Sequence, residues 1–157
     1  MSQTDLKDAK SIIYITCKAK ELEDSPFDKS DIADFLYEHL DQYGDERKYI
    51  MKCLDYALSE EPGKGGFVEI AYDNNKIVGA VIINLTGMGG YIPENILVYI
   101  AVNKEYRGHG IGKKLMEQTI KHTEGDVALH VEPDNPAKFL YEKYGFTNKY
   151  LEMRLKK

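Results

Sequence analysis

The chain has 157 residues, of which 43% are hydrophobic and 30% charged, the balance of a folded domain rather than of a disordered chain. Its formal net charge is −5 and it has no basic tract, which argues against nucleic acid as a partner. No stretch reaches the roughly 18 apolar residues of a membrane span, and the polar start lacks a signal pattern. We therefore expect a cytoplasmic protein without a membrane partner, built as one domain over residues 1–157 with a flexible start at residues 1–10.

Charge and metal-binding residue types say little more about function. Residues 1–62 hold 15 acidic against 8 basic residues, whereas residues 63–157 hold 11 against 13. This split suits a cation near the first part of the chain and an anion near the second. Cys17 and Cys53 form no CxxC pair, and the four histidines lack zinc-ligand spacing, so we expect buried thiols and no metal site.

The first part of the chain predicts one strand and two helices. Residues 11–19 alternate and are rich in β-branched side chains, which favours a strand. Residues 30–43 and 46–60 each carry an apolar stripe at helical spacing, and Gly44 follows the first of them as a stop signal.

A hairpin and a central strand come next. Residues 66–85 form two apolar runs around Asn74 and Asn75, residues that tolerate the positive φ of tight hairpin turns. Residues 86–95 read as a flexible loop, and 96–102 are nearly all apolar, as in a central strand.

The remaining elements complete a mixed layout. A helix over 110–123 joins the central strand to a strand at 126–132, so these two strands should be parallel neighbours. A short helix opened by Pro136 and a last strand at 150–157 follow. The order predicts an α+β (mixed α/β) fold in which helices flank a twisted, mostly antiparallel sheet.

Glycines gather where the central strand meets the helix, in "EYRGHGIGKKL" (105–115). A helix N-terminus exposes backbone N–H groups without partners and carries about half a positive charge, so it favours anions. Gly108, Gly110 and Gly112 would let the backbone approach a phosphate closely. A plain tight turn at Gly108 and Gly110 is the other interpretation.

Two common phosphate loops are excluded by spacing. A GxGxxG dinucleotide loop needs glycine where Lys113 stands. A P-loop ending at Gly112 needs glycine at Arg107 and serine or threonine at Lys114.

The stretch "VNKEYRGHGIG" resembles the R/Q-x-x-G-x-G/A acyl-CoA loop of the GNAT superfamily of N-acetyltransferases, with Arg107, Gly110 and Gly112 at its defining positions. The stretch "EPDNPAKFLYEKYGF" resembles the second signature of that family. The residues that match it are Asn135, Ala137, Tyr141, Gly145 and Phe146. The order of elements agrees from about Ser11 onward. The resemblance implies a GNAT-like sheet whose parallel strand pair splays apart at the cofactor site.

The resemblance also implies a function and a set of site residues. Acetyl-CoA would be the acyl donor and an unidentified primary amine, small or on a protein, the acceptor, which would attack the thioester directly in a ternary complex. Tyr141 would donate a proton to the departing sulfur. The cofactor would lie on Ile100, Ala101, Val102, Arg107, Gly108, His109, Gly110, Ile111, Gly112, Lys113 and Asn135. Lys114 is a further neighbour, and a homodimer is an expectation of the same kind.

Several groups are candidates for the general base that takes a proton from the attacking amine. Ile96 stands where some family members carry a glutamate, and Glu94, two residues earlier on the same strand face, is the best substitute. Glu69, Glu132 and a water relay are the alternatives.

Other readings stay open. The acceptor should lie between the N-terminal helices and residues 86–95, with Tyr56, Met88 and Tyr91 as apolar walls. A non-catalytic acyl-CoA sensor is the main alternative function; Tyr141 favours the enzyme, and Ile96 in place of glutamate favours the sensor.

Overall fold

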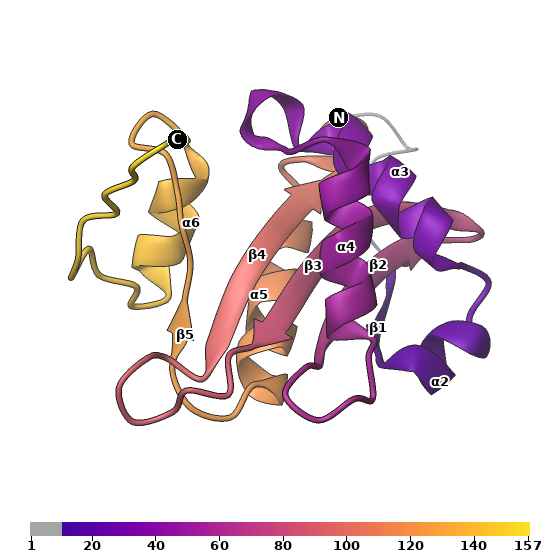
Figure 1. The fold of residues 1–157 in the computed structure, drawn as a ribbon. Helices are drawn as coiled ribbons and strands as arrows, with labels where there is room; N and C mark the ends of the chain where they lie inside the picture. Colours follow the sequence, from indigo (N-terminus) through magenta and orange to yellow (C-terminus); the bar gives the residue numbers. More distant parts are fainter. Residues whose placement is uncertain (1–10) are drawn as a thin grey trace.

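A single five-stranded sheet, with strand order β1-β2-β3-β4-β5, organises the computed structural model, which describes residues 11–157 (Figure 1). The strands are β1 (Ile13–Cys17), β2 (Gly66–Asp73), β3 (Lys76–Leu85), β4 (Asn95–Val102) and β5 (Val127–Ala128). Neighbouring strands are antiparallel except for β4 and β5, which are parallel. The predicted fold class is confirmed. The expectation for residues 1–10 lies outside the described residues.

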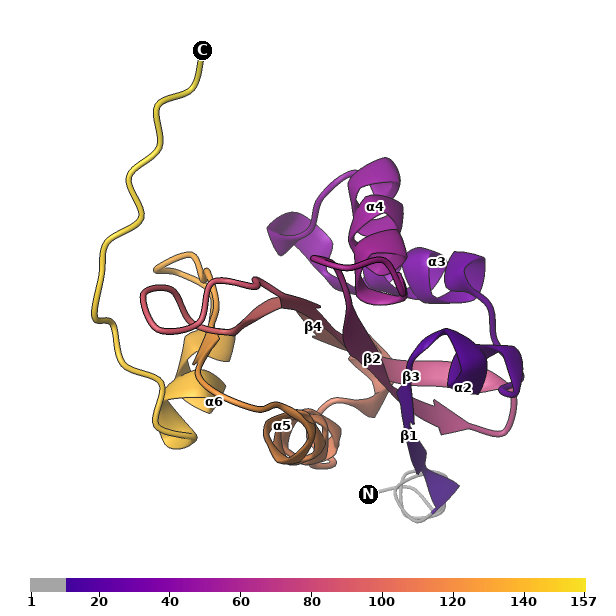
Figure 2. The same ribbon diagram turned by 60° about the horizontal axis from the view of Figure 1, so that its bottom comes forward.

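Helices cover both faces of this sheet. They are α2 (Ala19–Glu23), α3 (Lys29–His39), α4 (Arg47–Ala57), α5 (Ile111–His122) and α6 (Ala137–Lys143), with short 3₁₀ turns at η1 (Asp41–Tyr43) and η2 (Lys104–Tyr106). Figure 2 shows α3 and α4 on one face of the sheet, and α5 with α6 beside it on the other. Helix α2 falls at the end of the stretch that the sequence predicts as a strand.

Two apolar clusters hold these layers together. Ile32 and Leu36 of α3 and Leu54 of α4 are fully buried against one face of the sheet. Leu115 and Met116 of α5 are fully buried against the other. At about 1.5–3 kcal/mol for each large apolar side chain, burial of these stripes is what stabilises the three layers. The predicted burial of Cys17 and Cys53 is confirmed.

Local signals explain where two elements begin and turn. Asp28 is the N-cap residue of α3: its side chain accepts from the Asp31 amide at 2.9 Å, and the Asp31 carboxylate accepts from the Asp28 amide at 2.9 Å. The hairpin turns between Asp73 and Lys76, with Asn74 at a φ of 55°. The asparagine turn predicted from the sequence is confirmed.

The parallel strands β4 and β5 separate soon after they meet. Only Asn95 with Val127 and Ile96 with Ala128 are paired. Just beyond, the pairing of β4 with β3 shifts register, so that Val98 stands as an extra residue in β4. Such a bulge bends the strand that contains it, which turns β4 away from its neighbour. The predicted strand at 126–132 is therefore wrong in length, although the predicted parallel crossover is confirmed.

The C-terminal segment is not a strand. Residues 150–157 have no secondary structure and run away from the body of the molecule (Figure 2). The exposed fractions of Leu151 and Met153 are 82% and 91%. The predicted last strand is wrong because alternation gives an apolar side only, whereas a strand also needs a neighbour for its backbone hydrogen bonds, and no strand within residues 11–157 lies beside this segment.

Candidate active site

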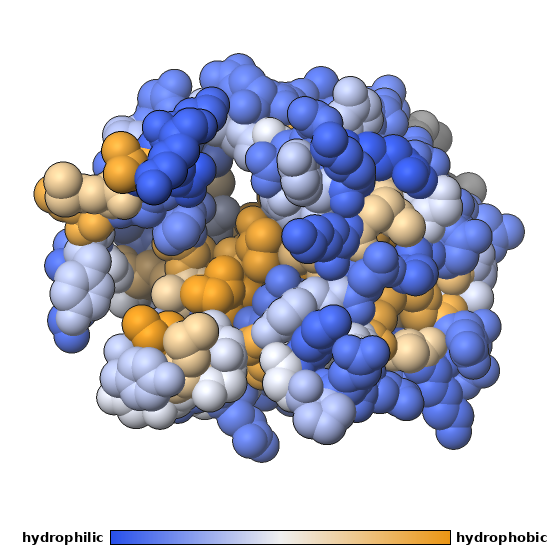
Figure 3. Space-filling view, viewed as in Figure 1, coloured by the Kyte–Doolittle hydropathy of each residue, from blue (hydrophilic) through white to orange (hydrophobic). Residues whose placement is uncertain are grey.

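A cavity of about 430 Å³ opens along β4 beyond the point where β5 diverges. Ile100, Ala101 and Val102 form its floor. The glycine loop with the start of α5 and α6 lines one side, and the end of α3 with η1 lines the other. The space-filling view shows this hollow with an apolar floor, between α6 with the C-terminal segment on the left and the rest of the molecule (Figure 3). The dimensions suit a slender, partly apolar ligand.

The loop before α5 presents a helix N-terminus to this cavity. Gly110 is the N-cap residue with a φ of 80°, in the left-handed region, and no side chain caps the helix. Gly108 has a φ of 86°, and no atom lies within 4 Å of where a Cβ would stand at either glycine. The first amides of α5 therefore face open space together with the positive end of the helix dipole, which makes an anion site.

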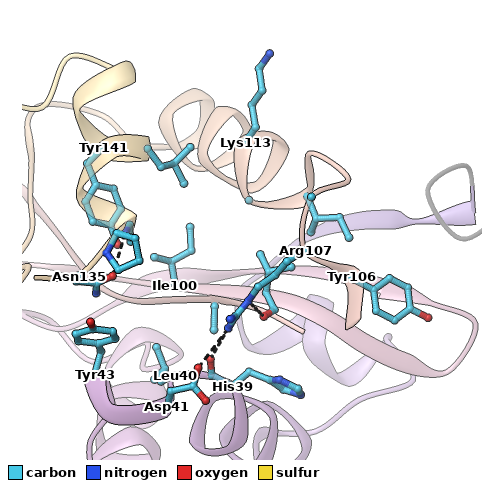
Figure 4. Close-up of a pocket in the computed structure, with 18 of the residues that line it drawn as sticks. His39, Leu40, Asp41, Tyr43, Ile100, Tyr106, Arg107, Lys113, Asn135 and Tyr141 are labelled. Atoms are coloured by element: carbon cyan, nitrogen blue, oxygen red, sulfur yellow. Dashed lines mark hydrogen bonds and ion pairs between the residues drawn. The ribbon is translucent and has the colours of Figure 1, made fainter. Parts of the chain in front are cut away.

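Arg107 is hydrogen-bonded to the backbone at the end of β4 and at the end of α3. Its Nε donates to the Val102 carbonyl and its Nη2 to the His39 carbonyl, each at 3.2 Å. The same Nη2 lies 3.6 Å from Oδ2 of Asp41 (Figure 4). This guanidinium ties the end of α3 to the end of β4, so its first role is to fix the shape of the cavity.

The two lysines that follow the glycines differ in placement. Lys113 is exposed at the edge of the cavity and extends outward (Figure 4). The Lys114 ammonium lies over the Tyr14 ring, 5.2 Å from its centroid, and Lys114 does not line the cavity. Of the two, Lys113 is the one placed to meet a charged ligand.

Tyr141 is held by α6 with its ring directed to the cavity (Figure 4). The side chain is 7% exposed and packs against Phe146, with ring centroids 5.9 Å apart. Burial raises the pKa of Tyr141 to about 12, so the hydroxyl is protonated and able to donate at neutral pH. Asn135 fixes the start of this helix, because its Oδ1 accepts from the Ala137 amide at 2.9 Å.

The residues predicted for the site come together with two exceptions. Those that line the cavity are Ile100, Ala101, Val102, Arg107, Gly108, Gly110, Ile111, Gly112, Lys113, Asn135 and Tyr141. His109 and Glu94 are outside the lining. The Glu94 carboxylate instead accepts from the Asp126 amide at 3.2 Å, at the loop that leads into β5. This placement does not bring Glu94 to Tyr141.

Part of the lining escaped the sequence reasoning. These residues are His39, Leu40, Asp41, Tyr43, Tyr106, Pro136 and Leu140, and the lining also includes Ala137, which the sequence analysis names only as a position of the second signature. The end of α3 and η1 reach the cavity only through tertiary contacts, so no local pattern marks them. His39 is buried, and burial lowers its pKa.

The three residues expected as walls of an acceptor site lie outside this cavity. Tyr56 donates its hydroxyl to the Leu85 carbonyl at 2.7 Å, and Met88 and Tyr91 are exposed. None of the three lines the cavity.

Metal binding and membrane crossing find no support in the described part of the chain. Residues 11–157 contain no group of three or more histidine, cysteine, aspartate or glutamate side chains placed to hold a metal ion. None of the helices in that range has the length and apolar character required to cross a membrane.

Comparison with solved structures places the fold among acetyltransferases. An aminoglycoside N-acetyltransferase AAC(6')-Iy in complex with CoA is 16% identical, with a TM-score of 0.63 over 93% of this chain and 94% of that one. The NatC complex bound to Gag peptide and CoA contains a chain that is 23% identical, with a TM-score of 0.65 over 87% of this chain and 85% of that one. These likenesses show the fold.

Sequence comparison goes further. N-alpha-acetyltransferase 30 of Schizosaccharomyces pombe is 33% identical over 85 residues, which are 51% of this chain. The chain spans 57% of the length of that relative. The family model described as "Acetyltransferase (GNAT) domain" matches residues 64–148, more than half of the chain, including the glycine loop and α6. The protein therefore belongs to the GNAT family of acetyltransferases.

Proposed function

We propose that the protein is an N-acetyltransferase that moves an acetyl group from acetyl-CoA to a primary amine by direct attack in a ternary complex. The observation that carries the proposal is the shared cavity of the uncapped α5 N-terminus and the buried Tyr141 hydroxyl. An anion site and a proton donor at the two ends of one apolar groove are what transfer from a phosphorylated thioester requires.

The cavity fits the cofactor on chemical grounds. Amides at Ile111, Gly112 and Lys113 can hold pyrophosphate oxygens, since no side chain caps them. Beyond Ile96 the free edge of β4 has no strand partner, so its N–H and C=O groups are open to the amides of a pantetheine arm. The apolar floor at Ile100 and Val102 suits the methylene groups between those amides.

Bound acetyl-CoA supplies an activated acyl thioester, and the chain's own groups manage the protons. The Tyr141 hydroxyl is protonated at neutral pH because burial raises its pKa to about 12, so Oη can give a proton to a leaving sulfur. An attacking amine must be neutral, and a free amine of ordinary pKa is neutral in only about one molecule in a few thousand at pH 7. Loss of the ammonium proton is therefore the second requirement.

Several groups are candidates to accept that proton. Glu69 is fully buried beneath α5 and does not line the cavity, and Glu94 is bound to the Asp126 amide. Glu132 is exposed on the segment that leads to α6. His130 is exposed between Leu129 and Val131, which both pack into the α5 cluster. Neither His130 nor Glu132 lines the cavity, so we propose that water takes the proton and passes it to one of these two exposed side chains, of which imidazole is the commoner general base.

The first acceptors to test are peptides with a free N-terminal amine. N-alpha-acetyltransferase 30 and the NatC complex with its bound Gag peptide suggest this class by name. The acidic excess of residues 1–62 also suits a cationic acceptor. Small polyamines and aminoglycosides form the comparison set, since an AAC(6') enzyme shares the fold.

The test is thiol release from acetyl-CoA in the presence of each amine, preceded by calorimetric titration with acetyl-CoA. Micromolar binding followed by amine-dependent thiol release supports the proposal. Tight binding without release on any amine would instead favour the acyl-CoA sensor. No binding at millimolar acetyl-CoA would overturn the proposal.

A further inference from the structure

One hydrogen bond crosses the cavity from wall to wall. The Tyr43 hydroxyl, at the end of η1, donates to the backbone carbonyl of Asp134 at 3.2 Å, across 91 residues of sequence. Tyr43 and Asn135, the residue after Asp134, face each other over the space beside Ile100 (Figure 4). The bond therefore links the α3 side of the cavity to the α6 side.

The bond reaches the turn that sets the start of α6. Asn135 donates its amide to the Glu132 carbonyl at 3.0 Å and accepts from the Ala137 amide at 2.9 Å. Ala137 is the first residue of α6, and Tyr141 follows about one turn later. A displacement of the Asp134 carbonyl therefore moves the helix that carries Tyr141.

The segment that carries Tyr43 is held in place by ion pairs and a hydrogen bond. Asp41, at the start of η1, lies 2.6 Å from the Lys104 ammonium and 3.6 Å from the Arg107 guanidinium. Arg107 also holds the His39 carbonyl at 3.2 Å. Two contacts thus anchor Asp41 of η1 to the junction between β4 and α5, and a third anchors the neighbouring end of α3 there.

The Tyr43 hydroxyl is available as a donor at neutral pH. Partial burial, and then the nearby carboxylates of Asp134 and Glu132, raise the pKa of Tyr43. Its proton is therefore retained through the physiological range.

We propose that Tyr43 is a positioning residue that closes the cavity over the bound cofactor and holds the start of α6, so that Tyr141 lies at the reacting end. The proposal rests on the proposed function for the identity of the ligand. A single neutral hydrogen bond is weak enough to open and re-form in each catalytic cycle, which a bulky nucleotide-bearing ligand requires in order to enter and leave.

The test compares Tyr43→Phe with a matched control, Tyr56→Phe. Tyr56 also donates its hydroxyl to backbone carbonyls, those of Leu85 at 2.7 Å and Gly63 at 3.2 Å, but it does not line the cavity. Loss of one neutral hydrogen bond corresponds to about a 3- to 10-fold change in an equilibrium. We expect CoA to dissociate about 3- to 10-fold faster from Tyr43→Phe, with KM for acetyl-CoA raised and kcat lowered, whereas the rate of CoA dissociation from Tyr56→Phe should match that of the wild type.

A readout that needs no ligand separates this proposal from the proposed function. Hydrogen exchange at the amides of Ala137 and Lys138 should quicken in Tyr43→Phe and stay unchanged in Tyr56→Phe, with or without CoA. Unchanged exchange and unchanged dissociation in Tyr43→Phe would overturn the proposal. Faster exchange in a protein that binds no CoA would sustain the link to α6 while the proposed function fails.

Discussion

The Glu69 carboxylate lies 3.2 Å from Nδ1 of His122, which joins the middle of β2 to the last turn of α5. Glu69 is fully buried and also accepts from the Thr16 hydroxyl at 2.6 Å. Its second oxygen has no partner within residues 11–157, and neither does the buried hydroxyl of Thr119 nearby on α5. This carboxylate is outside the cavity, so its effect is on stability.

Stability should depend on pH through Glu69. Burial, opposed by Thr16 and His122, raises the pKa of Glu69. A raised native pKa favours the protonated form, so the contribution to stability is full below the unfolded pKa, near 4.3, and is lost as pH rises through the native value. Glu69→Gln keeps the neutral form at every pH. We therefore expect the melting temperature of Glu69→Gln, relative to that of the wild type, to increase as pH rises from 5 to 9.

The size and control of this effect are measurable by calorimetry. Each kcal/mol corresponds to about 2–4 °C in a chain of this length. Glu124→Gln removes an exposed carboxylate just after α5 and should follow the wild type at all pH values. If the melting temperatures of Glu69→Gln and the wild type change with pH in the same way, ionisation of the buried carboxylate does not lower stability, and the prediction is wrong.

Removing the Tyr141 hydroxyl should affect turnover and spare binding. The hydroxyl is buried in the cavity with a pKa of about 12, and in the proposed function it donates a proton to the leaving sulfur. General-acid groups typically contribute about 10²–10⁴-fold to rate. In Tyr141→Phe we expect kcat to fall by that factor, while the Kd for CoA measured by calorimetry changes little. Equal turnover in the variant and the wild type would rule out the assigned role.

Gly110 should be sensitive to a side chain because of its backbone angle. A residue other than glycine in the left-handed region costs about 1–2 kcal/mol, and the φ here is 80°. Gly110→Ala should therefore lower stability and weaken CoA binding by about tenfold, since the loop can relieve strain only by moving its amides. Gly63→Ala is the matched control, because Gly63 has a φ of 86° and open space around its Cβ position but is outside the cavity. It should lose similar stability and keep the CoA affinity, and a similar loss of affinity would refute the argument.

Arg107 and Lys113 should respond differently to salt. Lys113 is exposed at the cavity edge, so Lys113→Met should weaken CoA binding several-fold at low ionic strength and little near 1 M salt, where screening is strong. Arg107→Lys keeps the charge but not the paired contacts to the Val102 and His39 carbonyls. Its loss of affinity should persist at high salt. Titrations at several salt concentrations distinguish the two, and salt-sensitive loss in both would mean that Arg107 acts mainly through its charge.

The parts of the molecule that the sequence predicts well are those with local causes. Asn74 marks its turn because few residues accept a φ of 55°. The glycine loop is recognisable because strand, glycines and helix are adjacent in the chain. Eight consecutive residues of β4 and twelve of α5 then carry unambiguous patterns.

The features that the sequence does not reveal depend on distant neighbours. The apolar alternation at Leu151 and Met153 predicts a strand, but pairing needs a second strand that local sequence does not reveal. Alternate residues share a strand face, which favours Glu94 as the base, but its carboxylate accepts a hydrogen bond from the Asp126 amide. Tyr43 is hydrogen-bonded to Asp134, 91 residues later in the chain, and the sequence around Tyr43 does not predict that contact.

The early divergence of β4 and β5 has a consequence for the lifetime of the protein. Because only two residue pairs join these strands, the sheet leaves backbone groups along β4 for a ligand to satisfy. A ligand that binds the native form alone raises the free energy of unfolding by RT ln(1 + [L]/Kd). Resistance to proteolysis should therefore follow cofactor supply, so that starvation for acyl-CoA would shorten the survival of the protein as well as halt its chemistry.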